Sequence, residues 1–222
     1  MATQIDPGAE PRVPLSRDRV LRAAMVLADE SGIESLSMRR LGQQLGVEAM
    51  SLYNHVANKD DILDGIVDIV VSEIDVPSSG TEWKAAMRRS AISAHDVLQR
   101  HPWANALMMS AGVRPARLRY MDSVLRRLRE AGFSAGMTHL AYHALDSHIV
   151  GFALWQAGYA ALPQDLSDLA ATFLREHSVD EYPYLVEHVE QHLKERSADD
   201  VSEFEFGLDL ILDGLERVRD TA

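Results

Sequence analysis

The sequence predicts an all-α protein in which a small helix-turn-helix unit precedes a larger helical body. Apolar residues recur at helical spacings of three and four along most of the 222 residues. No segment rich in Val, Ile and Thr alternates between apolar and polar residues as a strand would. We expect a flexible arm over 1–14, a helix-turn-helix domain over 15–60, a linking helix over 61–76 and a larger domain over 77–222.

The first three helices are marked by capping and turn residues. Ser16 and Ser37 each precede an apolar stretch, and their hydroxyls are placed to cap a helix N-terminus. Gly32 follows the first helix as a stop signal, and Gly46 can take the positive φ of a sharp turn before a helix over 48–55. Two short helices joined by a tight turn are typical of a DNA reader whose second helix lies in the major groove.

The 48–55 helix has one apolar side and one side suited to DNA. Leu52 and Val56 supply the buried side, and hydroxyl, amide and methyl groups on the other can contact phosphates or base edges. Arg39 and Arg40 begin the preceding helix, and Lys59 lies at the next helix N-terminus, where a phosphate binds favourably. An ordinary polar surface on a three-helix core is the alternative. The exposed positions are Ala49, Met50, Ser51, Tyr53, Asn54 and His55.

Charge and composition narrow the function classes. The chain carries a net charge of −12, yet from Arg12 to Lys59 seven basic residues stand against five acidic ones. The helix-turn-helix domain, called the head below, thus falls on the basic stretch, while the larger domain over 77–222, called the body, is acidic. This distribution fits a protein that binds DNA at one place and not a protein that coats DNA. The absence of cysteine excludes disulfides and thiolate metal sites. With no apolar run near the roughly 20 residues of a membrane span and no signal-peptide core, we expect a cytoplasmic protein without a membrane partner.

The rest of the chain is predicted to be helical. The helix that starts at Lys59 and runs to about residue 75 is apolar on several faces, so we expect it to be held between two bodies as a mechanical link. Residues 77–80, Pro-Ser-Ser-Gly, should end it. Further helices are expected at about 81–99, 103–110, 115–131, 135–160, 165–177, 181–196 and 200–219.

Two of these helices are candidates for self-association. The 204–218 segment carries a wide apolar surface with Gly207 and Gly214 beside it, and the 135–160 segment is similarly apolar. Core helices of a monomer are the alternative. A recognition helix that reads half a palindrome needs a second one about 34–36 Å away, which favours a homodimer. The predicted interface residues are Phe204, Leu208, Ile211, Leu215 and Val218.

The stretch GIESLSMRRLGQQLGVEAMSLYNHVANKDDIL resembles the N-terminal domain of the tetracycline-repressor (TetR) family. GVRPARLRYMDSVLRRLREAGFS and FEFGLDLILDGLERV resemble, more weakly, the ligand-binding and dimerising domain of the tetracycline-repressor branch. The resemblance implies double-stranded operator DNA and a small-molecule effector as partners, and a four-helix dimer interface. Position by position, it places DNA contacts on Met38, Arg39, Ala49, Met50, Ser51, Tyr53, Asn54, His55 and Lys59.

The effector site is the least determined part of the sequence. Aromatic and methionine side chains suit a cavity wall, although each also suits a plain core. By the resemblance, Arg114 and Pro115 belong to a coupling loop, and Ser110 and Trp155 stand where that branch has its metal-binding His and a nearby acid. We therefore expect no magnesium–tetracycline chelate, no cofactor and a largely apolar effector. The candidate residues are Trp83, Met87, Ser90, Leu107, Ser110, Arg114, Pro115, Tyr120, His139, Tyr142, His143, Asp146 and Trp155.

His139, His143 and Asp146 share one helical face and offer a competing interpretation. Two His spaced by four can bind a metal, so a metal-dependent enzyme is the alternative function. No HExxH motif, phosphate-binding loop or nucleophile–base pair accompanies them, and a pocket or interface role is favoured. We expect a non-enzymatic, ligand-responsive repressor that binds a palindromic operator, with an activator of the same family as the second choice.

Overall fold

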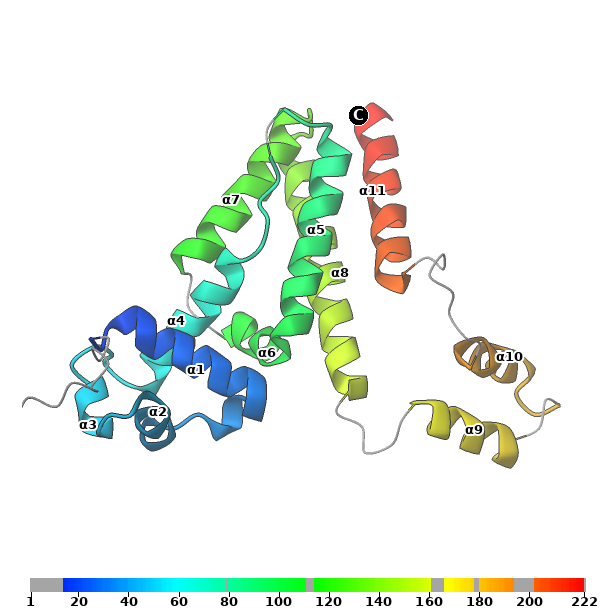
Figure 1. Ribbon diagram of the computed structural model, residues 1–222. Coiled ribbons are helices and arrows are strands. Elements are labelled where there is room, and N and C mark those ends of the chain that lie inside the picture. Colours follow the sequence, from blue (N-terminus) through cyan, green and yellow to red (C-terminus); the bar gives the residue numbers. More distant parts are fainter. Residues whose placement is uncertain are drawn as a thin grey trace, which may run out of the picture.

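The computed structural model describes residues 14–78, 80–110, 114–160, 166–177, 180–193 and 202–221, and within these ranges it contains helices and no strand (Figure 1). The all-α prediction is confirmed. The elements are α1 (Arg17–Ser31), η1 (Ile33–Ser35), α2 (Met38–Leu45), α3 (Ala49–Leu52), α4 (Lys59–Ser72), α5 (Trp83–Arg100), α6 (Pro102–Ser110), α7 (Pro115–Glu130), α8 (Ala135–Ala160), α9 (Leu166–Glu176), α10 (Pro183–His192) and α11 (Glu203–Thr221).

The predicted caps hold the first helices in place. Ser16 Oγ accepts a hydrogen bond from the Arg19 backbone N–H at 3.2 Å, and Ser37 Oγ accepts one from the Arg40 N–H at 3.3 Å. Gly46 ends α2 in the left-handed conformation, at φ 69°. Each device satisfies backbone groups that a helix end leaves without partners.

Two helices are shorter than predicted. The α3 helix ends at Leu52, because the chain turns through Tyr53–His55 to reach Asn58, whose side chain caps α4 by accepting from Asp61 N–H at 2.8 Å. The α4 helix ends at Ser72, because side chains of α5 form hydrogen bonds with the backbone that follows. There the Ser93 hydroxyl accepts from Asp75 N–H at 2.9 Å, while Ser90 donates to the Asp75 carbonyl at 2.6 Å.

The α4 helix joins the N-terminal helices to the body (Figure 1). Its apolar residues pack against α1 on one side and against α5, α6 and α7 on the other. Gly65 permits the close approach of α1, since a Cβ atom there would lie 2.7 Å from Leu21 Cδ2. The position predicted for a linking helix is therefore occupied by a helix packed on both sides, with Ile62, Ile66, Val67, Val70 and Val71 buried.

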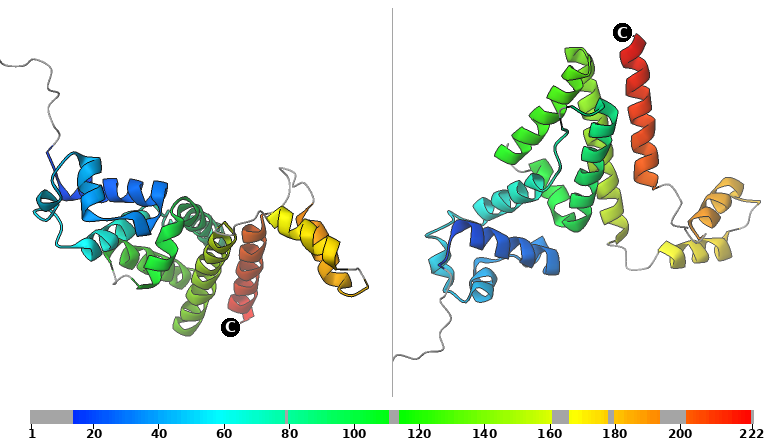
Figure 2. Two further views of the ribbon diagram at one scale, coloured as in Figure 1. Left: turned by 90° about the horizontal axis from the view of Figure 1, so that it is seen from below. Right: turned by 45° about the horizontal axis from the view of Figure 1, so that its top comes forward.

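The body is built on α5, α8 and α11, which lie side by side, with α7 packed against α8 and α4 (Figure 1). The α9 and α10 helices contact each other and project from the other helices in each view (Figure 2). No helix in the part of the chain described is both long enough and apolar enough to cross a membrane.

Candidate DNA-reading face and effector cavity

The α2–α3 region presents most of the predicted DNA-contacting side chains. Leu52 and Val56 are buried in the head, while Met50 is 74% exposed and Tyr53 45% exposed. Asn54 is exposed as well. This gives α3 and the turn that follows it an outer side formed by apolar and polar groups that can meet base edges and phosphates.

The flanking positions differ in how freely they can reach DNA. Arg39 and Lys59 are exposed, and Arg40 is exposed but donates to the Ser31 hydroxyl at 3.0 Å. Met38 packs partly against the core. The structure therefore gathers the polar candidates around α2 and α3, and gives Met38 a role in packing. Besides Met38, the half-buried members of the predicted set are Ala49, Ser51 and His55.

An ion pair that the sequence analysis missed braces this head. The two terminal guanidinium nitrogens of Arg17, Nη1 and Nη2, donate to the Asp61 carboxylate at 2.7 Å, and Asp61 also accepts from Ala57 N–H at 2.9 Å. The guanidinium hydrogen bond is the main cause that lowers the pKa of Asp61 to about 2. The pair ties the start of α1 to the first turn of α4 across 44 residues of sequence, so no local pattern reveals it.

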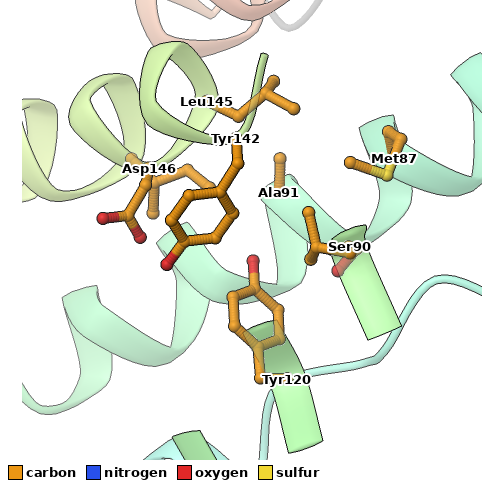
Figure 3. A pocket seen from close by; sticks show the side chains of 9 residues that line it. Met87, Ser90, Ala91, Tyr120, Tyr142, Leu145 and Asp146 are labelled. Carbon is orange, nitrogen blue, oxygen red and sulfur yellow. The ribbon is translucent and has the colours of Figure 1, made fainter. Parts of the chain in front are cut away.

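A small cavity lies between α5, α7 and α8 (Figure 3). Tyr120 of α7 points toward Tyr142 of α8, and the Asp146 carboxyl lies beside the Tyr142 ring. The free volume is about 10 Å³, which is close to the space for one water molecule. The lining residues are Met87, Ser90, Ala91, Tyr120, Val124, Tyr142, Leu145, Asp146 and Ile149.

Burial disfavours the charged forms of the titratable groups that line the cavity. Burial raises the pKa of Tyr120, and it raises the pKa of Tyr142 to about 12. It also raises the pKa of Asp146, an effect that nearby Arg117 partly offsets. The Tyr142 phenol lies close enough to Asp146, and the Tyr120 phenol close enough to Ser90, to influence the tyrosine pKa values. The cavity thus offers phenol and carboxyl groups that can exchange hydrogen bonds with a ligand.

Five predicted effector residues line this cavity, and the others lie elsewhere. Trp83 is buried against Phe133, whereas Trp155 is 45% exposed and contacts Phe152. His139 and His143 are exposed, and Leu107 is half-buried. The side chain of Ser110 lies outside the described residues. The cavity is lined by one side each of α5, α7 and α8, so predicted residues on other sides or other helices do not reach it. The residues that the prediction missed are Ala91, Val124, Leu145 and Ile149, at helical spacings from those it found.

Arg114 and Pro115 join α7 to the linking helix. Arg114 forms an ion pair with Asp64 of α4. One helical turn further along α4, Asp68 Oδ1 accepts from the backbone N–H of Ala116 at 2.8 Å. The first turn of α7 is thereby held on α4, and Tyr120 projects from the second turn into the cavity.

The histidine pair has no metal-site geometry. The rings of His139 and His143 lie 4.6 Å apart at an exposed surface, while Asp146 belongs to the cavity lining. Among the residues described, no three His, Cys, Asp or Glu side chains are grouped to hold a metal ion. The enzyme alternative therefore gains no support from this face.

The predicted dimer residues divide between two faces of α11. Phe204, Leu208 and Leu215 are buried within this chain, so they are corrected to core residues. Ion pairs from Lys84 and Arg88 of α5 hold that side of α11 inward at 2.5–2.8 Å. A second apolar face is left open. It comprises Phe206 (60% exposed), Leu210 (56%) and Val218 (45%) on α11, with Leu140 and Leu154 exposed on α8.

Comparison with known proteins agrees with this architecture. Residues 76–219 match the family model for the tetracyclin repressor-like C-terminal domain, and residues 20–66 match that for bacterial regulatory proteins of the tetR family. The chain is 31% identical over 221 residues to the HTH-type transcriptional repressor DrrR1 of Streptomyces coeruleorubidus, covering 95% of this chain and 80% of that protein.

Two further relatives extend the comparison. Tetracycline repressor protein class C of Escherichia coli is 31% identical over 210 residues, which is 92% of each chain. The crystal structure of the TetR family protein ActR of Streptomyces coelicolor in complex with actinorhodin gives a TM-score of 0.75 at 27% identity, covering 93% of this chain and 99% of that one. The resemblance found in the sequence is confirmed, and the chain belongs to the TetR family of bacterial transcriptional regulators.

Proposed function

We propose that the protein is a dimeric repressor that binds a palindromic operator and leaves it when a small organic effector enters the α5–α7–α8 cavity. The observation that carries this proposal is the connection from Tyr120 to the linking helix. Tyr120 lines the cavity, and the first turn of the same helix is bonded to α4 through Asp64 and Asp68. A change of cavity size thereby reaches the helix that carries the head.

The cavity must expand to admit an effector. Its free volume of about 10 Å³ is far below the roughly 300–1,000 Å³ typical of small-molecule sites. An entering molecule displaces Tyr120 or Tyr142, and a displaced Tyr120 moves α7 against α4. A ligand that binds the expanded state more tightly shifts the population toward it, and a shift from 1:99 to 99:1 takes about 5.5 kcal/mol of differential affinity.

A second connection runs through α5. Tyr120 and Ser90 line the same cavity, and the Ser90 hydroxyl donates to the carbonyl of Asp75, just beyond the end of α4. Displacement of Tyr120 therefore changes the surroundings of Ser90, whose hydroxyl holds the backbone just beyond the C-terminal end of the linking helix. Both ends of the body-facing part of α4 respond to the same tyrosine.

The open apolar face on α8 and α11 supports a homodimer. Large exposed apolar side chains on two adjacent helices are expensive to leave in water, and a matching face on a second copy would cover them. Two copies supply the two reading heads that a palindrome requires. We place this function in the cytoplasm, where the operator lies.

The cavity chemistry favours an effector with aromatic rings and oxygen groups, which is more polar than the largely apolar molecule expected from sequence. Met87 and Leu145 offer apolar walls, while Tyr120, Tyr142 and Asp146 offer hydrogen-bonding groups. The ActR structure contains actinorhodin. The cavity of the present protein has its own lining, so we expect it to bind a different organic molecule. Ser110 and Trp155, which stand where the tetracycline-repressor branch holds its metal chelate, argue against magnesium–tetracycline.

Selection of duplexes from a randomised DNA pool tests the proposal. The expected result is enrichment of one inverted repeat, bound by a dimer in sedimentation analysis. Mass spectrometry of small molecules that co-purify with the protein then supplies effector candidates for release assays. A pool that stays unenriched after several rounds would refute the function.

A further inference from the structure

The C-terminal end of α1 is bonded to the body through Asp29. Its Oδ1 accepts a hydrogen bond from Trp103 Nε1 at 2.6 Å and another from His101 Nδ1 at 2.7 Å. A carboxylate only accepts, so the Nδ1 of His101 must carry the hydrogen. Both donors belong to the α5–α6 junction, 72 and 74 residues away in sequence.

The linking helix joins the same cluster. Glu73, the residue that follows α4, places its Oε2 3.5 Å from His101 Nε2 and accepts from Arg100 at 2.6 Å. His101 and Trp103 are buried. Asp29, Glu73, His101 and Trp103, called the Asp29 cluster below, therefore connect the head, the linking helix and the body at one point, where α1 passes beneath α6 in Figure 1.

The α1 helix is thus held at both ends. The Arg17–Asp61 pair fixes its start to α4, and the Asp29 cluster fixes its end to the body. At 1.5 Å per residue, the two attachment points lie about 18 Å apart along the helix axis. A head attached at one point can pivot, whereas attachment at two separated points removes that rotation.

We propose that Asp29, His101 and Trp103 are positioning residues that fix the angle of the reading head on the body, and so set the half-site spacing that the dimer accepts. This inference rests on the proposed function. Moving a half-site by one base pair shifts it by about 3.4 Å and rotates it by about 34°, which a fixed pair of heads cannot follow. Freely pivoting heads follow it with a smaller loss of affinity.

Asp29→Asn and Trp103→Phe test the inference in the full-length protein. The probe is the duplex selected by the wild-type protein, together with versions in which the half-sites are one or two base pairs closer or farther apart. The wild type should prefer one spacing by about tenfold or more, and each variant should reduce that preference to about threefold or less while keeping its affinity for a single half-site. Trp103→Phe keeps the buried ring, so its folding should survive.

Asp18→Asn is the matched control. Asp18 is also an acidic residue of α1, but it is exposed and pairs with Arg22 in the same helix, so its loss should leave the spacing preference unchanged. Wild-type spacing preference in both folded test variants, Asp29→Asn and Trp103→Phe, would overturn the inference.

A DNA-independent measurement separates this inference from the proposed function. The chain has no cysteine, so spin labels at Gln44→Cys and Glu130→Cys, both exposed, report the head-to-body distance after dilution with unlabelled protein. Trp103→Phe should broaden the distance distribution. An unchanged distance distribution contradicts the positioning role of the Asp29 cluster. If the distribution broadens but the wild-type protein selects no palindrome, the positioning role is supported and the proposed repressor function is refuted.

Discussion

A Cβ atom at Gly42 would lie 2.8 Å from the carbonyl oxygen of Val47 and 3.2 Å from the backbone nitrogen of Ala49. These distances leave no room for a side chain between α2 and the start of α3. Gly46, at φ 69°, makes the turn between them. The two glycines set the angle between the helices, and with it the direction in which Met50 and Tyr53 face.

Gly42→Ala should destabilise the head by about 1–3 kcal/mol, because the added methyl group presses on backbone atoms that cannot rotate away. Chemical denaturation followed by circular dichroism measures the change. Gly136→Ala, at an exposed helical position with open space around it, is the control and should be neutral or slightly stabilising. Equal stability of the two variants would contradict the close approach.

Arg39→Ala and Tyr53→Phe should weaken operator binding while leaving stability nearly unchanged, because both side chains are exposed on the reading face. The arginine change should cost about 1–3 kcal/mol if the guanidinium contacts a base. Mobility shifts with the selected duplex give the affinities. Unaltered shifts for both variants would place the reading face elsewhere.

The Arg17–Asp61 pair should make the head sensitive to acid. The folded pKa of Asp61, about 2, lies below its ordinary 3.8, so its contribution is complete above 3.8 and is lost as the pH falls from 3.8 through 2. The difference in urea midpoint between wild type and Asp61→Asn should accordingly be largest above pH 5 and shrink toward pH 2.5. A difference that stays constant over this range would argue against the pair.

At the scale of whole helices, α11 shows how one segment serves two surfaces. It is apolar on two sides, and the ion pairs of Lys84 and Arg88 with acidic residues of α11 reinforce the packing of the side that turns inward. Each exposed pair contributes little by itself, but a row of them fixes the rotation of a helix. The side that remains outside is the one available to a second copy.

Leu208→Glu and Leu210→Glu should therefore have opposite effects. Leu208 is fully buried in its own chain, so a charge there should unfold the body. Leu210 is exposed, and the same charge should separate the dimer while the monomer stays folded. Sedimentation and thermal unfolding distinguish the two results. A dimer that survives Leu210→Glu would show that this face is not the interface.

For the molecule as a whole, the cavity and the reading face are joined by a continuous set of contacts. Tyr120 lies in the cavity, the first turn of α7 is bonded to α4, and α4 is paired with α1 through Arg17 and Asp61. The switch that we propose therefore needs no direct contact between effector and DNA. The switch needs an effector that can enter the cavity only when α7 moves.

Ala91→Phe should imitate an occupied cavity. Ala91 is a buried lining residue, and a ring there forces the neighbouring tyrosines apart, at a cost of about 1–3 kcal/mol in stability. Operator affinity should fall without any ligand. Adding Asp64→Ala and Asp68→Ala, which cut the connection to α4, should restore much of it.

Ala85→Phe, at an exposed position of the same helix, is the control for Ala91→Phe and should bind the operator as the wild type does. Thermal unfolding checks that each variant is folded. If a folded Ala91→Phe protein keeps full operator affinity, cavity size does not govern the head.

The helices and the inner and outer sides of the N-terminal domain could be predicted from sequence because their signals are local. Ser16, Ser37 and Asn58 cap helices within three residues of themselves, and Gly46 makes its turn alone. Leu52 on the reading helix and Val56 after it mark the inner side of this region by spacing. Such interactions depend on neighbours in the chain, so the sequence determined them and the family resemblance followed.

The cavity lining, the two faces of α11 and the Asp29 cluster were decided only by tertiary structure. Asp29 meets His101 across 72 residues, and Lys84 meets Glu216 across 132. Periodicity identifies an apolar side of a helix but does not say which helix covers it, and α11 has two such sides. Which side is buried depends on the combined packing and charge of helices far apart in the chain. No local sequence pattern reports these long-range interactions.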